Sequence, residues 1–153
     1  MYNSINNSSS GDYGEYKRKI VNVNASTYSV LTKDSGSIIT IDVAGGCAIT
    51  LPAAEAGLEY EFHVGTTFTG TWSITAASSA DTYQGVVWTH DKDELGAVTA
   101  MNENIDTSAF NCPAAADYVM TADADTDGRF IGSHVKFTAI SDSKWLLSGN
   151  LFG

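Results

Sequence analysis

The chain is poor in positive charge and in long apolar runs. Of its 153 residues only 8 are Lys or Arg, against 18 Asp or Glu, which gives a formal net charge of -10. A surface of this charge repels nucleic acid and anionic lipid, so we expect neither nucleic acid nor a membrane as a direct partner. No apolar run approaches the length of a membrane span, and the first residues are too polar for a secretion signal.

Cysteine is also scarce, with two residues in the whole chain. Cys47 and Cys112 lie far apart in the sequence, so one disulfide between them remains open, but a disulfide framework is excluded. Cys47 alternates with apolar residues, and for this reason we expect a buried free thiol there. The cysteine usage and the polar first residues favour a protein that is made and kept in a reducing cytosol, or assembled there into a larger particle.

Signatures of the common catalytic and metal sites are missing. The sequence has no Cys-x-x-Cys pair for zinc, no G-x-S-x-G nucleophile motif and no phosphate-binding glycine loop. His63, His90 and His134 are scattered, and His63 falls on the polar side of a strand-like run. Carboxylates are so frequent that pairs at glycosidase spacing arise by chance. We therefore predict that the protein is not an enzyme.

What the chain does contain is an alternation of apolar and polar residues with a period of two. This pattern is typical of strands that bury one face. It is clearest over residues 31–64, where three runs place the following side chains on one side: Ile39, Ile41 and Val43; Cys47, Ile49 and Leu51; Tyr60, Phe62 and Val64. Gly85 interrupts a later run, which predicts a bulge or a close approach of two backbones. Residues 53–57 are expected to form one helical turn closed by Gly57.

About ten such runs, separated by polar turns, predict an all-β fold. The expected architecture is an antiparallel β-sandwich or a jelly-roll-like barrel with an extended N-terminal arm. We place one β-domain over residues 20–153, with a long loop region at about 89–117. Loops of this length in a compact domain usually serve a function or an interface. No internal repeat is visible in the sequence.

Residues 1–19 differ from the rest of the chain. They are rich in Asn, Ser and Gly without apolar periodicity, which predicts a flexible arm. One interpretation is a disordered leader with incidental aromatic residues. The other is an arm that becomes ordered on a partner, because Tyr and Arg are frequent anchors in protein interfaces. The candidate contacts in this arm are Tyr2, Tyr13, Tyr16, Lys17, Arg18 and Lys19, of which the basic residues suit an acidic partner, such as another copy of this chain.

A second candidate site is the segment with Asp123, Asp125 and Asp127 followed by Gly128. Alternate carboxylates before a glycine are typical of the start of a calcium-binding loop. The twelfth position is His134 instead of the bidentate Glu, and the flanking residues indicate strands instead of helices. We favour an Asp-rich turn that keeps a hairpin soluble. Calcium is the alternative interpretation, and the sequence predicts no other cofactor.

Turn and core positions spread over residues 28–149 form a further pattern. They are Leu31, Ser35, Gly36, Leu51, Pro52, Ala56, Gly57, Tyr60, Phe62, Trp72, Ile74, Gly85, Val135, Phe137, Trp145 and Gly149. This pattern resembles a β-rich module of structural proteins of tailed bacteriophages, including those of cyanobacterial phages. Such modules occur in capsid decoration proteins, head fibres and tail-fibre segments. The arm before Ile20 and the region 89–117 depart from the pattern of the family.

The resemblance implies a virion structural protein without catalytic residues. The leading expectation is a capsid decoration (cement) protein, assembled in the host cytoplasm and located on the outer surface of the phage head. It would form a homo-trimer and bind the major capsid protein or another virion protein. The alternative is a receptor-binding or carbohydrate-binding module of a tail fibre or head fibre. In that case exposed aromatic side chains stack on sugar rings, and Trp88 is the candidate.

Overall fold

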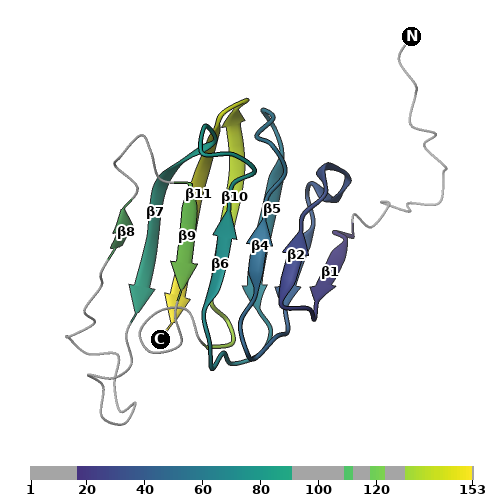
Figure 1. Ribbon diagram of the computed structural model, residues 1–153, viewed down its shortest axis with the longest axis vertical. Coiled ribbons are helices and arrows are strands. Elements are labelled where there is room, and N and C mark those ends of the chain that lie inside the picture. Colours follow the sequence, from purple (N-terminus) through teal and green to yellow (C-terminus); the bar gives the residue numbers. More distant parts are fainter. Residues whose placement is uncertain (1–16, 91–108, 112–117, 123–129, 153) are drawn as a thin grey trace, which may run out of the picture.

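The computed structural model describes residues 17–90, 109–111, 118–122 and 130–152. Within these ranges the regular secondary structure is β-strand except for one short 3-10 helix, η1 (Thr32–Asp34), which confirms the predicted all-β class. Two sheets face each other (Figure 1). The larger sheet consists of β1 (Ile20–Val23), β3 (Ile38–Ile41), β5 (Glu59–Val64), β10 (His134–Ser141), β11 (Lys144–Phe152), β7 (Thr82–His90) and β8 (Ala109–Asn111), in this spatial order. The smaller sheet has the order β2 (Thr27–Ser29), β4 (Ala48–Thr50), β6 (Trp72–Thr75) and β9 (Val119–Ala122).

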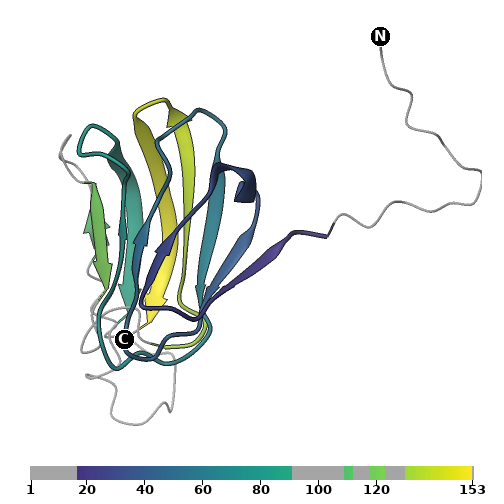
Figure 2. The ribbon, with the colours of Figure 1, turned by 45° about the vertical axis from the view of Figure 1, so that its right-hand side comes forward.

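The first seven strands alternate between the two sheets as the chain proceeds. Odd-numbered strands join the larger sheet and even-numbered strands join the smaller one. The colours of Figure 2, which follow the sequence, show this alternation. Consequently β1, β3 and β5 are parallel neighbours, and so are β2, β4 and β6. From β1 to β6 the chain thus winds between the two sheets, and each turn of this winding adds one strand to each sheet. This structural repeat is not visible in the sequence.

The prediction of an antiparallel arrangement is wrong, because both sheets are mixed. Besides the wound strands, β11 is parallel to β7. Antiparallel pairing occurs between β5 and β10, β10 and β11, β7 and β8, and β6 and β9. Alternation of apolar residues shows which side of a strand is buried, and the pattern is the same in parallel and in antiparallel strands. Whether two neighbouring strands are parallel depends on the connections between them, and here consecutive strands belong to opposite sheets.

The hairpin of β10 and β11 lies in the middle of the larger sheet. It fills the position between β5 and β7, so that Phe137 is opposite both Tyr60 of β5 and Leu147 of β11. Strand β11 then pairs along its whole length with β7. The hairpin therefore joins the wound part of the sheet to β7 and β8.

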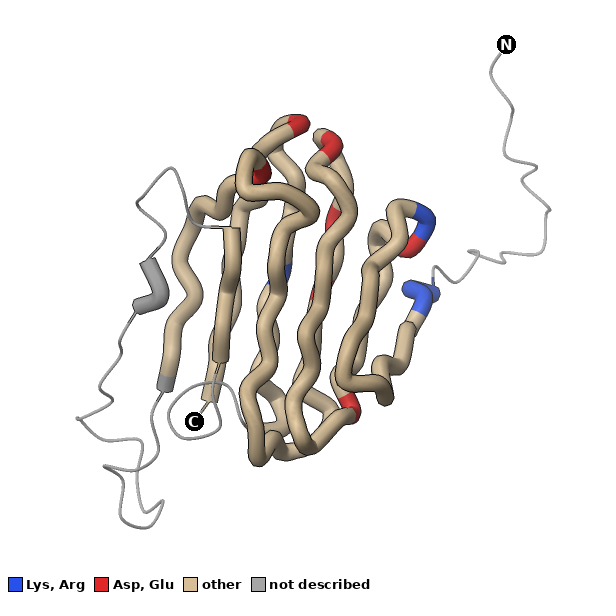
Figure 3. Tube along the Cα trace, viewed as in Figure 1, with Lys and Arg blue, Asp and Glu red and all other residues tan. Residues whose placement is uncertain are grey.

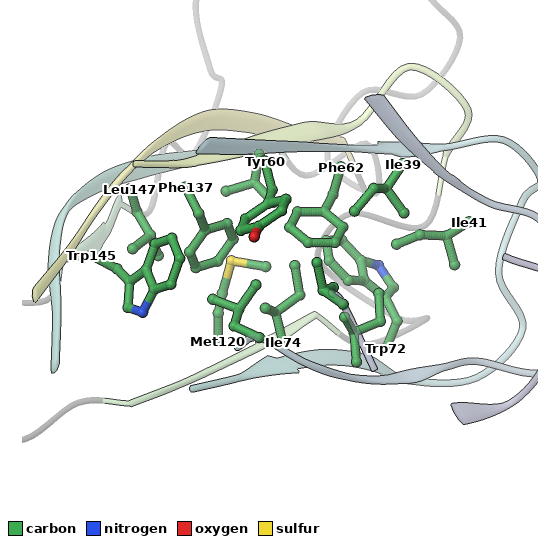
Figure 4. Close-up of a cluster of buried hydrophobic side chains, with 14 of the residues drawn as sticks. Ile39, Ile41, Tyr60, Phe62, Trp72, Ile74, Met120, Phe137, Trp145 and Leu147 are labelled. Carbon is green, nitrogen blue, oxygen red and sulfur yellow. The ribbon is translucent and has the colours of Figure 1, made fainter. Parts of the chain in front are cut away.

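Large apolar side chains fill the space between the two sheets (Figure 4). The inward faces that the alternation predicts are confirmed for the three runs of residues 31–64, except that Val43 is only partly buried. Aromatic rings of β5 pack on rings of the hairpin, with ring centroids 5.9 Å apart for Tyr60 and Trp145 and 5.7 Å apart for Phe62 and Phe137. Burial of each such side chain contributes about 1.5–3 kcal/mol. The core thus holds the hairpin against the wound strands.

Two buried tyrosines place their hydroxyl groups on backbone carbonyls. Tyr83 of β7 donates to the carbonyl oxygen of Ile74 on β6 at 3.1 Å, which links the two sheets. Tyr60 donates to the carbonyl oxygen of Leu31 at 3.3 Å. Burial is the main reason that the pKa of Tyr60 is raised to about 12. Both rings therefore bury their apolar part without leaving the hydroxyl group unpaired.

Several local predictions can be compared directly with the structure. Residues 53–57 do not form the expected helical turn, and only Ala56 and Gly57 lie in a turn. Cys47 is a buried free thiol, as predicted, and burial raises its pKa. Cys112 lies outside the described residues. In the expected loop region at about 89–117, β7 continues to His90 and β8 forms a short strand.

Gly85 marks a close approach of two backbones. It lies within β7 with φ of +122°, and a Cβ atom there would lie 2.1 Å from the carbonyl oxygen of Leu147 on β11. The register between β7 and β11 is continuous past this point. Of the two sequence-based alternatives, the structure therefore shows the close approach and not the bulge.

Replacing Gly85 by alanine (G85A) should destabilise the protein more than G57A. Both glycines have positive φ, so both variants incur the strain of about 1–2 kcal/mol that an L-residue has there. The new Cβ meets open space at Gly57 but overlaps β11 at Gly85, so we expect G85A to lose at least about 3 kcal/mol. Urea unfolding followed by circular dichroism measures both losses. Equal losses would contradict the close approach.

Candidate interaction surface on the larger sheet

The larger sheet has one face that points away from the smaller sheet. The register of the strands arranges the outward residues of this face in rows that run across the sheet. One row extends from β7 to β1 and consists of Trp88, Asn150, His134, His63, Thr40 and Asn22. All of these side chains are polar except for the ring face of the tryptophan. The row forms a continuous line of hydrogen-bonding groups along the outside of the sheet.

Large apolar side chains gather at the β7 end of this face. Val86 and Trp88 project from β7, and Leu146 and Phe152 project from the adjacent strand β11. Their exposed fractions are 37%, 48%, 44% and 40%, respectively. We call these four residues the apolar band. Scattered apolar residues are normal on a surface, but a group on two neighbouring strands marks a candidate interaction site.

The apolar band lies in an almost uncharged part of a highly acidic protein. Among the outward positions of β7 and β11 that the structure describes there is no Asp or Glu, and Lys144 is the one residue with a full charge. Figure 3 shows the acidic residues of the described chain mainly at turns and on other strands. A second surface can therefore approach the band without the repulsion that the net charge of -10 would otherwise cause.

The other half of the face carries a cluster of polar and charged side chains around Glu61. Arg18 forms an ion pair with one carboxylate oxygen of Glu61, and the Nε2 atom of His63 lies 2.8 Å from the other. Arg18 also donates from Nε to the carbonyl oxygen of Gly36 at 2.9 Å. The hydrogen bond from Arg18 is the main reason that the pKa of Glu61 is lowered. The cluster fixes the chain segment before β1 to the outside of β5.

The residues predicted to contact a partner can be placed only in part. Arg18 is paired with Glu61, and Lys19 forms an ion pair with the buried carboxylate of Asp34. A partner would have to compete with these internal ion pairs. Lys17 is exposed at the start of the described residues. Tyr2, Tyr13 and Tyr16 lie outside the described residues, so the partner contacts stay predictions.

The candidate calcium ligands Asp123, Asp125 and Asp127 also lie outside the described residues. Within the described ranges, no three His, Cys, Asp or Glu side chains are grouped so that they could share a metal ion. Within the same ranges, no helix has the length and apolar character needed to cross a membrane.

Sequence reasoning named Trp88 as a binding candidate but did not group it with Val86, Leu146 and Phe152. Trp72 and Trp145 are buried, whereas Trp88 is exposed. Side chains alternate along β7, so Trp88 points away from the core that Tyr83 and Val87 face, and this alternation is visible in the sequence. The position of Leu146 and Phe152 beside β7 is not visible there, because it depends on the pairing of β7 with a strand distant in the sequence.

The Glu61 cluster predicts a specific dependence of stability on pH. A lowered pKa in the folded state means that Glu61 contributes stability above its ordinary pKa of about 4.3, and that this contribution disappears as the pH falls through the lowered pKa. The variant E61Q should therefore lose stability relative to the wild type at pH 7 and less of it below pH 4. Urea unfolding at several pH values measures the difference. The exposed Glu55 supplies the control E55Q, whose free energy of unfolding should change with pH as that of the wild type does. The prediction would be contradicted if the free energy of unfolding of E61Q also followed the wild type at every pH.

Comparison of the chain with protein-family models, with curated proteins and with solved structures gives no match in any of the three. The resemblance to structural proteins of tailed bacteriophages therefore stays a prediction from the sequence. The apolar band and the row of polar residues beside it are the features on which a function can be argued.

Proposed function

We propose that the protein is a virion structural protein, namely a decoration (cement) protein that binds the outer surface of a phage head. The observation that carries this proposal is the apolar band on the outer face of the larger sheet. Its four side chains project from β7 and β11. Both are interior strands of that sheet, and each is paired with another strand on both sides. A surface that is held in this way loses little conformational entropy when it binds.

The composition of the band suits a protein partner. Interfaces of stable complexes bury about 1,200–2,000 Å² in total and combine an apolar centre with a polar rim. Here Trp88 and Leu146 supply candidate anchors, and Asn150 and Ser148 lie between band residues on β11. Tryptophan is among the residues that most often dominate binding energy. The expected partner is the major capsid protein or another virion protein.

The proposed mechanism is mechanical. A copy that contacts two neighbouring shell subunits adds association free energy that the internal pressure of the packaged DNA must overcome. Three copies joined as a homo-trimer would bind several subunits at once, and this multivalency strengthens the attachment without any new type of contact. The location that follows is the outer surface of the virion, after assembly in the cytoplasm of the host.

We extend the proposal to the finer architecture of the body, for which we favour a β-sandwich over a barrel. The strand order supports this choice, because among the described strands the larger sheet runs from β1 to β8 and the smaller sheet from β2 to β9, without closure onto one another. The packing of side chains from both sheets into one layer supports it as well (Figure 4).

A charge placed in the apolar band should weaken binding to particles. In the variant L146K an ammonium group would be buried at the interface, and we expect at least a tenfold loss of affinity, equivalent to about 1.4 kcal/mol. Co-sedimentation with particles that lack the protein measures this affinity. Ile131 lies in the turn before β10 and is also exposed, so I131K is the matched control and should bind as the wild type does. Binding of folded L146K at wild-type strength would count against the proposal.

A specific observation also favours the alternative, a carbohydrate-binding module of a tail fibre or head fibre. Trp88 exposes about half of its side chain, and the amide side chain of Asn150 is opposite it in register. An exposed indole ring offers a flat apolar surface for a sugar, while a neighbouring amide offers both a donor and an acceptor. Binding of a glycan from the surface of the host cell would then replace binding of a capsid protein.

Tryptophan fluorescence separates this alternative from the decoration role. Trp72 and Trp145 are buried, so quenching by iodide should report mainly on Trp88. If the protein binds a glycan at Trp88, polysaccharide from the host surface should protect the emission from iodide. If the polysaccharide gives no protection while the protein binds particles, the carbohydrate-binding alternative is wrong.

A further inference from the structure

His63 and His134 form a pair on the outer face of the larger sheet. They are directly opposite each other on the adjacent antiparallel strands β5 and β10, in the interior of the sheet. Their rings are stacked, with centroids 5.5 Å apart and an interplanar angle of 18°. Opposite residues of an antiparallel pair have Cβ atoms about 4.5–5.5 Å apart. The backbone therefore holds two imidazole rings next to each other on one surface.

In each ring one nitrogen atom already has an acceptor. Nε2 of His63 lies 2.8 Å from a carboxylate oxygen of Glu61, and Nδ1 of His134 lies 3.4 Å from the carbonyl oxygen of Gly132. A proton on each of these nitrogens leaves Nδ1 of His63 and Nε2 of His134 as lone-pair donors. Histidine ligands of metal ions typically have this arrangement, in which the second ring nitrogen donates to a carboxylate or a backbone carbonyl.

The carboxylate behind His63 is itself held in place. Arg18 forms an ion pair with Glu61 and is hydrogen-bonded to the carbonyl oxygen of Gly36. The series Arg18, Glu61 and His63 thus orients one imidazole ring through two further side chains. Support of this kind fixes the tautomer of a ligand before an ion arrives.

We propose that His63 and His134 together bind one divalent transition-metal ion of the Zn²⁺ class. The ligand atoms are Nδ1 of His63 and Nε2 of His134, and water completes the coordination shell. Imidazole nitrogen suits Zn²⁺, Ni²⁺ and Cu²⁺, in contrast to the carboxylates at Asp123, Asp125 and Asp127, which suit a hard cation. Two nitrogen ligands of a tetrahedral ion lie about 3.3 Å apart. The ring centroids are 5.5 Å apart, so the two partly exposed rings turn toward each other when they bind the ion.

The proposed site faces outward and is independent of the role in a virion. It lies in the same row as Trp88, with Asn150 between His134 and the tryptophan. The water molecules on the ion point away from the sheet. A histidine or carboxylate from another protein can replace them, so the ion would connect this face to a partner.

Calorimetric titration of the full chain with ZnCl₂, after removal of metal with EDTA, tests the proposal. We expect uptake of zinc that H63Q and H134Q each weaken by at least tenfold. The third histidine supplies the control H90Q, which should bind as the wild type does. E61Q should weaken binding by about 10–100-fold, because it removes the carboxylate behind His63. Circular dichroism checks that each variant is folded.

The nitrogen resonances of the imidazole rings identify the ligand atoms. On addition of Zn²⁺ we expect large ¹⁵N shifts at Nδ1 of His63 and at Nε2 of His134 in the wild type. Absence of zinc uptake by the folded wild type would overturn the proposal. Uptake that H63Q and H134Q leave unchanged would overturn it as well, since the ion would then be bound elsewhere on the chain.

Discussion

The pairing of the β10–β11 hairpin with β5 on one side and β7 on the other is the interaction on which the structure depends. This pairing completes the larger sheet, and it brings Phe137 and Trp145 against the aromatic rings of β5. Both candidate surfaces are products of it. The apolar band requires β11 beside β7, and the histidine pair requires β10 beside β5. Neither surface would exist if the hairpin were placed elsewhere.

Stacking of successive turns of the winding explains two glycines in the connections between strands. A Cβ at Gly46 would lie 2.1 Å from the carbonyl oxygen of Thr71, and one at Gly70 would lie 2.3 Å from the carbonyl oxygen of Gly45. These residues belong to the connections from β3 to β4 and from β5 to β6. The two connections touch because the strands on either side of them are parallel neighbours in both sheets. Glycine is therefore needed for contact between turns of the winding as well as for the bends themselves.

The sequence was a good guide to what is local and a poor one to what is distant. Alternation places Tyr60 and Phe62 inside and His63 outside, and it is also sufficient to place Trp88 outside once Val87 is taken as buried. Strand direction and register were not accessible, because one alternating pattern fits parallel and antiparallel neighbours equally. For the same reason the sequence could show His63 and His134 singly but not as a pair. Their proximity depends on a register between strands that are distant in the chain.

The position of the hairpin also has a consequence for biosynthesis. Strands β5 and β7 leave the ribosome before β10 and β11, which follow every other described strand in the chain. Until the hairpin emerges, both earlier strands present an open edge, and the aromatic side chains of β5 lack their packing partners. Open edges and exposed apolar residues in a nascent chain promote aggregation. Stable tertiary structure must therefore form late, after translation of the hairpin, and a chaperone that shields β5 and β7 in the interval would raise the yield of native protein.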